Sequence, residues 1–133
     1  YHFAPHFWTM ANAAYTYTQD LNTKKFLPQI PPIKGLVELN YRYPRYFVAT
    51  LSGQWAAKQS QVAEGEDKTD GYFILNFGIR SEKIKMYSSA WQFFAGMDNI
   101  LDTEYYNHLA TTRTGVRIPE AGRNIYAKVQ FSW

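Results

Sequence analysis

Hydrophobic and polar positions alternate with a period of two along several stretches of this chain. The alternation is clearest in residues 122–133, where one set of alternate positions is apolar and the other is mostly polar. The apolar set is Ile125, Ala127, Val129, Phe131 and Trp133, and the polar set is Asn124, Tyr126, Lys128, Gln130 and Ser132. A helix would mix the two sets on every face, whereas a strand separates them. The pattern therefore predicts a strand with two different faces.

The same alternation predicts five further strands, at residues 7–18, 35–43, 46–58, 72–80 and 87–98. We expect one face of this sheet to meet lipid and the other to meet water or polar protein. The residues predicted to face lipid are Phe47, Leu51, Trp55, Phe73, Leu75, Phe77, Trp91, Phe93, Val129 and Phe131. The residues predicted to face a lumen are Glu38, Arg42, Gln54, Asn76, Arg80, Gln92 and Lys128.

The connections between the predicted strands alternate in length. Residues 44–45 and 81–85 are short enough to be tight turns, and residues 20–32, 59–71 and 100–123 are long and polar. Short turns on one rim and long loops on the other are typical of outer-membrane barrels, with the long loops facing outward. The sequence thus predicts an all-β fold, an antiparallel meander that forms part of a transmembrane β-barrel. The last strand then ends on the periplasmic side.

Composition supports a barrel wall and excludes several other classes. The 133 residues suffice for one domain, and the net charge of +3 is too small to imply a polyanionic partner. No cysteine is present, so disulfides and thiolate chemistry are excluded. Aromatic residues make up 18% of the chain although its mean hydropathy is only -0.42. No apolar run is long enough for a membrane-spanning helix, and this does not exclude a protein that crosses the membrane with strands.

Two motifs stand near the end of the chain. The first is Asn99-Ile-Leu-Asp102, followed by Tyr105 and Tyr106, and the second is Ile118-Pro-Glu-Ala-Gly-Arg-Asn124 before the last alternating strand. Together they resemble the end of a TonB-dependent outer-membrane receptor, a family in which an Asn-Leu-Phe-Asp-like motif closes a strand and a Pro-Gly-Arg-like motif opens the final one. Ile100, Leu101 and the terminal Trp133 depart mildly from the commoner residues. The resemblance spans residues 20–133.

The resemblance implies a larger protein than this chain. Members of the family have about 22 strands around a plug, whereas about six strands fit here, and the sequence starts at Tyr1 without an initiating Met or an apolar leader. We therefore expect residues 1–133 to be the C-terminal portion of the barrel, without its plug. The implied partners are membrane lipid, the receptor's own plug and remaining strands, TonB through the missing N-terminal part, and the barrel-assembly machinery, which would read Trp133. The implied cargo is a ferric siderophore or another metal chelate, with haem, cobalamin, copper or an oligosaccharide as alternatives.

Candidate ligand-binding residues lie in the last long loop. His108, Arg113 and Arg117 are close enough in sequence to contact an anionic ligand or a metal chelate, but a lone histidine is a poor set of metal ligands. We favour a solvated loop histidine over a binding site. The acidic residues 64–67 with Asp70 lack the spacing of a calcium loop, so we interpret them as a solubilising loop and predict no metal site.

The remaining polar motifs point to structure and not to catalysis. Asp98, Asn99 and Asp102 follow a predicted strand, where such side chains more often fix backbone turns. The sequence contains no Gly-x-Ser-x-Gly, no His-Glu-x-x-His and no glycine-rich phosphate loop, so we predict that the chain is not an enzyme and needs no cofactor.

Two other classes fit parts of the pattern. A soluble β-barrel that binds a small apolar ligand would turn the apolar face inward. A basic, aromatic β-domain that stacks single-stranded nucleic acid would interleave cations with aromatic rings on one face. The apolar faces here are nearly free of cations, so we expect no nucleic-acid partner.

Overall fold

The chain forms one antiparallel sheet in the computed structural model, which describes residues 1–110 and 118–133. Its strands are β1 (His2–Ala4), β2 (Phe7–Ala14), β3 (Lys34–Tyr43), β4 (Phe47–Ala56), β5 (Tyr72–Ser81), β6 (Ile84–Met86), β7 (Ser89–Asp98) and β8 (Asn124–Ser132). The described residues form no helix, and accordingly none that could cross a membrane. The fold is all-β, as the alternating pattern predicts.

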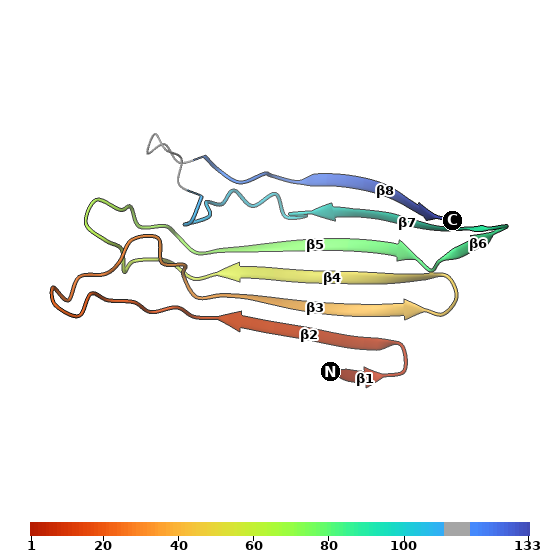
Figure 1. Ribbon diagram of the computed structural model, residues 1–133, viewed down its shortest axis with the longest axis horizontal. Coiled ribbons are helices and arrows are strands. Elements are labelled where there is room, and N and C mark those ends of the chain that lie inside the picture. The colour runs from red at the N-terminus through yellow and green to blue at the C-terminus, as the bar shows by residue number, and fades with distance from the viewer. Residues whose placement is uncertain (111–117) are drawn as a thin grey trace.

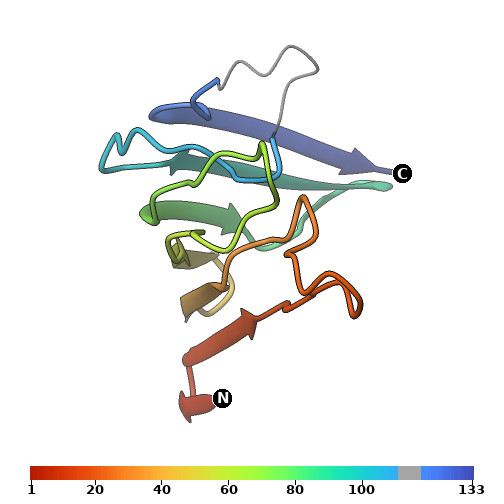
Figure 2. The ribbon, with the colours of Figure 1, turned by 90° about the vertical axis from the view of Figure 1, so that its left-hand side faces the viewer.

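The sheet is a meander in which neighbours in sequence are neighbours in space (Figure 1). Strands β1 to β5 follow chain order, and β7 comes next, with β5 and β6 on one side of it and β8 on the other. Every pairing is antiparallel. Figure 2, which views the sheet end-on, shows the strands as a single layer with no second sheet packed against it.

The six predicted strands correspond to β2, β3, β4, β5, β7 and β8. Their predicted ends lie within two residues of the observed ones, except that β2 stops at Ala14 where the pattern extends to residue 18. Two short strands, β1 and β6, were not predicted. The predicted count of about six strands is therefore correct for the long strands and incomplete for the short ones.

The prediction of a tight turn at residues 81–85 is wrong. Arg80 pairs with Phe94 and Ile84 pairs with Trp91, so three residues of one strand lie opposite two of the other. This is a β-bulge, and its extra residue shifts the alternation of the strand that follows. The chain reverses later, between Met86 and Ser89, which pair with each other.

The predicted turn at residues 44–45 is confirmed. The Tyr46 N–H donates to the Tyr43 carbonyl at 3.2 Å, which closes a four-residue turn. Pro44 supplies the fixed φ of its second position, and Arg45 at the third has a φ of 68°. Glycine is the usual residue at that position because it has no Cβ to strain.

The register confirms the two predicted faces. Leu51 lies opposite Leu39 on one side and Phe77 on the other, and Phe93 lies opposite Val129. When these pairings are followed across the sheet, all ten residues predicted to face lipid share one side. All seven predicted lumen residues share the other. Their separation is observed, and what each face meets stays a prediction.

The sheet has almost no core of its own. Val48, Ala56 and Ile74 are the buried hydrophobic residues of the described chain, and all three lie on the polar side. That side also holds a hollow of about 340 Å³, lined by residues that include Ser52, Asn76, Arg80 and Tyr126. The apolar side is exposed along its length, with Val37, Phe73, Phe93 and Val129 each about half accessible. A sheet normally buries its apolar face against another layer, and here no such layer is present among the described residues.

The long connections gather at one end of the sheet and the short turns at the other (Figure 1). Residues 15–33 and 57–71, together with the described parts of 99–123, form the long end. The chain ends at the opposite, short-turn end, as the alternation of connections predicts.

Candidate functional site

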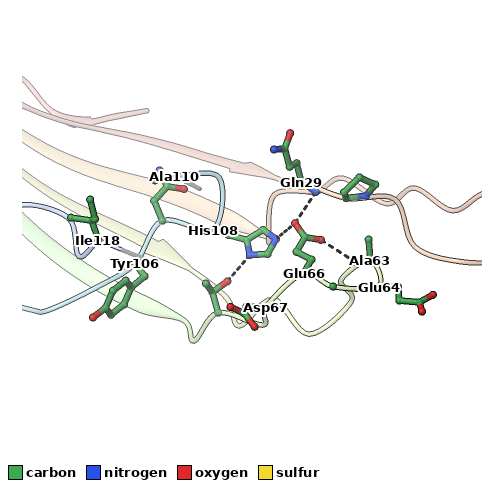
Figure 3. Close-up of a pocket in the computed structure, with 13 residues that line it drawn as sticks. Gln29, Ala63, Glu64, Glu66, Asp67, Tyr106, His108, Ala110 and Ile118 are labelled. Atoms are coloured by element: carbon green, nitrogen blue, oxygen red, sulfur yellow. Dashed lines mark hydrogen bonds and ion pairs between the residues drawn. The ribbon is translucent and has the colours of Figure 1, made fainter. Parts of the chain in front are cut away.

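The three long connections are joined by a polar cluster around a buried histidine. His108 is 7% exposed, and its Nδ1 lies 2.8 Å from the hydroxyl of Thr69. Its Nε2 lies 3.4 Å from Oε1 of Glu66, whose side chain is also largely buried (Figure 3). His108 belongs to the β7–β8 connection, and Thr69 and Glu66 belong to the β4–β5 connection.

Glu66 joins the β2–β3 connection to this group. Its Oε1 accepts a 2.8 Å hydrogen bond from the backbone N–H of Gln29, and its Oε2 accepts one of 3.0 Å from the N–H of Ala63 (Figure 3). Carboxylates that accept backbone N–H groups make stronger hydrogen bonds than neutral acceptors. The Glu66 side chain therefore accepts hydrogen bonds from the β2–β3 connection and from its own β4–β5 connection, and it contacts His108 of the β7–β8 connection. We call Glu66, His108 and Thr69 the loop clasp.

Thr69 is positioned by a short ladder with Gln59. The two residues exchange backbone hydrogen bonds of 2.9 and 3.1 Å, and both are buried. The Gln59 side-chain amide donates to the carbonyl of Ile30 at 2.7 Å. This contact is a second link between the β2–β3 and β4–β5 connections. The long end of the sheet is thus held by polar contacts instead of an apolar core.

The chemistry of the clasp is structural. The order hydroxyl, imidazole, carboxylate resembles that of a hydrolase triad, but the Thr69 hydroxyl is buried and lies 2.8 Å from the His108 ring. The tautomer with the proton on Nε2 suits this arrangement, because Nδ1 then accepts from Thr69 and Nε2 faces the Glu66 carboxylate at 3.4 Å, although Nε2 makes no hydrogen bond. The opposite tautomer would set a nitrogen lone pair against Glu66.

A cleft of about 330 Å³ lies beside the clasp. Its lining comes from all three connections and includes Pro28, Gln29, Glu64, Asp67, Tyr106 and Ile118. At its rim the exposed carboxylate of Glu64 pairs with Lys25 at 2.7 Å. The described lining thus carries the carboxylates of Glu64, Glu66 and Asp67, and the clasp forms one wall of the cleft.

The Asn-Ile-Leu-Asp motif makes a tight backbone lock where β7 ends. Asn99 is buried with a φ of 48°, and its side-chain oxygen accepts from the Thr103 N–H while its amide donates to the Thr103 carbonyl, each at 2.9 Å. The Asn99 N–H donates to the side chain of Asn76 on β5 at 2.8 Å. Asparagine tolerates the left-handed conformation, which explains its place here.

The two motifs of the sequence meet in space. Oδ1 of Asp102 accepts from the N–H of Arg123 at 2.8 Å, and Nε of Arg123 donates to the carbonyl of Ile100 at 3.0 Å. A Cβ added to Gly122 would lie 2.9 Å from the Asp102 carboxylate, so only glycine fits without a shift. The interpretation of Asn99 and Asp102 as residues that fix turns is confirmed.

Tyr105 packs on this lock. Its ring lies 4.4 Å from that of Tyr72, and its carbonyl accepts from the N–H of Glu120 at 2.9 Å. Burial, and then the nearby Glu120 carboxylate, raise the pKa of the Tyr105 phenol. Both effects disfavour the charged phenolate.

The predicted ligand-binding residues have different outcomes. Arg113 and Arg117 lie outside the described residues. The interpretation of His108 as a solvated loop residue is wrong, because the residue is 7% exposed and contacts Thr69 and Glu66 of the β4–β5 connection. Within residues 64–67, Glu64 is exposed as expected, but Glu66 is drawn into the clasp. Across residues 1–110 and 118–133, no three or more His, Asp or Glu side chains are placed to hold a metal ion.

Sequence analysis missed Thr69, Gln59 and Gln29. Each is a common loop residue, and their contacts join positions 29 to 39 residues apart or pair two arms of one connection. No periodicity marks such contacts. A polar residue buried in a loop becomes recognisable only once its partner from another loop is known.

Comparisons with known proteins extend the picture at the level of fold. No protein-family model matches the sequence, and no curated protein matches it. Among solved structures the chain is similar to the copper transporter OprC, with a TM-score of 0.84 and 24% sequence identity. The match covers 97% of this chain and 21% of that chain, so the chain spans about a fifth of that transporter's length. This likeness shows the fold that both share.

Proposed function

We propose that residues 1–133 are the C-terminal portion of the wall of a TonB-dependent outer-membrane receptor, which imports a metal chelate by energy-coupled transport. In this proposal the apolar side of the sheet faces lipid and the polar side faces the lumen and its plug. The long end lies outside the cell. The chain supplies wall and outer loops, and transport belongs to the complete receptor.

The two-faced single layer is the observation that carries the proposal. One side presents exposed apolar residues such as Phe77, Phe93 and Val129, and the other is polar and hollowed. In water such a face would need another layer to cover it, whereas hydrocarbon covers it in a membrane barrel. A soluble calyx would line its hollow with the apolar set, but the hollow is lined mostly by the polar side.

Three further observations support the receptor class. The connections alternate between short and long. The Asn-Ile-Leu-Asp and Gly-Arg motifs, which resemble those of TonB-dependent receptors, form one lock between β7 and β8. The shared fold with a copper transporter extends over nearly the whole chain.

The proposed cargo is a ferric siderophore or another metal chelate, as the family resemblance implies. Copper is the second candidate, because the similar solved structure is named as a copper transporter. The two cargoes can be distinguished by which metal the receptor takes up.

The experiment uses a bacterium that carries the complete receptor and its deletion strain. We expect the receptor in the outer-membrane fraction, and uptake of its cargo to stop when a protonophore collapses the energy supply. Uptake of radioactive ferric chelate that depends on the receptor supports the first cargo, and receptor-dependent uptake of radioactive copper supports the second. A receptor recovered in the soluble fraction would contradict the proposal as a whole.

A further inference from the structure

All three histidines of the chain lie within the described residues, and they differ in their surroundings. His2 and His6 belong to the short-turn end and are exposed, whereas His108 is buried in the loop clasp at the long end. Histidine is the side chain that ordinarily gains or loses a charge between about pH 5 and pH 8. The clasp that joins the long connections therefore contains a group of the kind that responds to pH.

Glu66 brings a carboxylate into the clasp without a permanent cation. Among the described residues no lysine or arginine lies within ion-pair distance of it, and the His108 ring does. Its largely buried oxygens accept the N–H groups of Gln29 and Ala63, which are neutral donors. A carboxylate shielded from water is stabilised further by a hydrogen-bonded opposite charge. Within the described clasp, that charge is supplied by a proton on His108.

Other titratable groups surround the ring from the elements packed against it. They are Glu64, Asp67 and Tyr106 in the cleft, and Lys34, Asp70 and Tyr72 in a second cavity of about 50 Å³. Glu64 pairs with Lys25 at 2.7 Å, and Asp70 pairs with Lys58 at 3.1 Å. None of these carboxylates and ammonium groups lies within ion-pair distance of the ring, so the Glu66 carboxylate is the charge that the ring meets first.

The Thr69 hydroxyl suits both protonation states of the ring. When the ring carries one proton, on Nε2, the hydroxyl donates to Nδ1 across 2.8 Å. When Nδ1 gains the second proton, the same hydroxyl accepts from it, because a hydroxyl is both a donor and an acceptor. A backbone N–H in this place would oppose the new N–H. Protonation of His108 therefore keeps its contact with Thr69.

The opposite nitrogen has a contact that protonation strengthens. Nε2 is buried, makes no hydrogen bond, and faces Oε1 of Glu66 at 3.4 Å (Figure 3). Hydrogen bonds between a charged donor and a carboxylate are shorter and stronger than those of a neutral donor. This contact is also the one through which the β7–β8 connection meets Glu66, which the N–H of Gln29 ties to the β2–β3 connection.

We propose that the loop clasp is a pH-sensitive joint. Proton uptake by His108 turns its contact with Glu66 into a charged hydrogen bond that holds the three long connections together, and proton loss weakens this hold. The charged pair exists only while the clasp is closed, so proton uptake and closure favour each other, and the connections open more readily as the pH rises. This response does not depend on what either face of the sheet meets. That the clasp senses the pH outside the cell rests on the proposed function.

The test follows amide exchange of the complete receptor in detergent, by mass spectrometry, at about pH 5.5 and about pH 8, a range in which carboxylates and phenols ordinarily keep their charge. Each rate is divided by the intrinsic rate at that pH, so that the ratio reports local opening. The reporter amides are Gln29 and Ala63, which donate to Glu66. The amides of β4 show whether the sheet as a whole changes.

Three variants assign the response to the clasp. His108→Gln removes the titrating ring, and Glu66→Gln keeps an acceptor but removes the charge. The matched control His6→Gln removes an exposed histidine from the short-turn end. Heat-modifiable migration on a gel shows that each variant is folded.

In the wild type and in His6→Gln we expect opening at the reporter amides to be greater at the higher pH by about threefold or more, with β4 unchanged. In His108→Gln and Glu66→Gln the opening should be nearly the same at both pH values. If one of these two variants fails to fold, the other carries the comparison.

Equal opening of the folded wild type at the two pH values would overturn the inference. Greater opening at the lower pH would also overturn it, because burial of the charged ring would then outweigh its pairing with Glu66. A response that persists unchanged in His108→Gln would assign the effect to another group. A receptor found in the soluble fraction, with the pH response intact, would contradict the proposed function and leave the pH-sensitive clasp standing.

Discussion

Oδ1 of Asp102 accepts a 2.8 Å hydrogen bond from the backbone N–H of Arg123, 21 positions later in the chain. The bond joins the end of β7 to the residue before β8, and the Arg123 side chain returns to the Ile100 carbonyl. A connection of more than twenty residues is thereby closed at its base. These contacts fix the base of the connection beside the strand pair β7–β8.

Removing this carboxylate should weaken the last strand pair. We expect Asp102→Ala to lower the free energy of unfolding of the complete receptor in vesicles by about 1.5–3 kcal/mol, because a charged acceptor of a backbone N–H is lost. Asp102→Asn keeps an acceptor and should cost less. Urea titration of the three proteins checks the order. Equal midpoints for wild type and Asp102→Ala would show that the bond contributes nothing.

Tyr126 lies across two glycines on the polar side, and the two should respond differently to an added methyl. A Cβ on Gly96 would lie 2.6 Å from both Cζ of Tyr126 and the Phe77 carbonyl, whereas one on Gly78 would lie 3.3 Å from the Tyr126 hydroxyl. We expect Gly96→Ala to cost about 1–3 kcal/mol through overpacking and Gly78→Ala to cost much less. The same unfolding titration measures both. A larger cost for Gly78→Ala would refute the packing described.

Loss of the loop clasp should release the long connections. In Glu66→Ala the N–H groups of Gln29 and Ala63 lose their acceptor and His108 loses its partner. We expect the free energy of local opening to fall by about 1.5–3 kcal/mol, seen as faster amide exchange at Gln29, at Ile30 and in residues 107–109. Glu64→Ala removes only an exposed ion pair, so it is the matched control and should change exchange little. Similar exchange in both variants would mean that Glu66 holds no loops.

The terminal aromatic is predicted to act in assembly. Trp133 follows β8, is 90% exposed, and contacts the Phe131 ring at 5.5 Å. Such an exposed ring contributes little packing to this sheet, so we expect Trp133→Asp to lower the amount of receptor in outer-membrane fractions more than it lowers the stability of inserted protein. Trp133→Phe should restore the amount. Normal insertion of Trp133→Asp would show that the residue is ordinary packing.

Much of the sheet is predictable from sequence because its rule is local. Strand alternation repeats every two residues, so the facing of Leu51 or Phe93 follows from neighbours a few positions away. β6 escapes prediction for the same reason: the bulge at 81–83 shifts the alternation, which puts Ile84 on the opposite side from Arg80. A pattern along one strand cannot show a bulge, because a bulge is defined by how that strand pairs with its neighbour.

The candidate site was predictable only in its motifs. Asn99 and Asp102 are residues that commonly fix turns, and their role could be inferred from position alone. The burial of His108 could not, because it depends on Glu66 and Thr69, which lie about forty residues away and come together only when the loops pack. The sequence shows that each loop is polar, but it does not show which polar groups of different loops pair.

Adjacent residues of β8 offer the most direct test of the central claim that the apolar side of the sheet faces lipid. Residues 1–133 contain no cysteine, so Val129→Cys or Gln130→Cys adds a single labelling site to this portion, and any cysteine elsewhere in the complete receptor is replaced by serine before spin labelling in vesicles. Val129 lies on the apolar side and Gln130 on the polar side. Collisional relaxation by apolar oxygen and by a water-soluble nickel complex then reports what surrounds each label. We predict that oxygen dominates at position 129 and the nickel complex at position 130. Dominance of the nickel complex at position 129 would contradict the account.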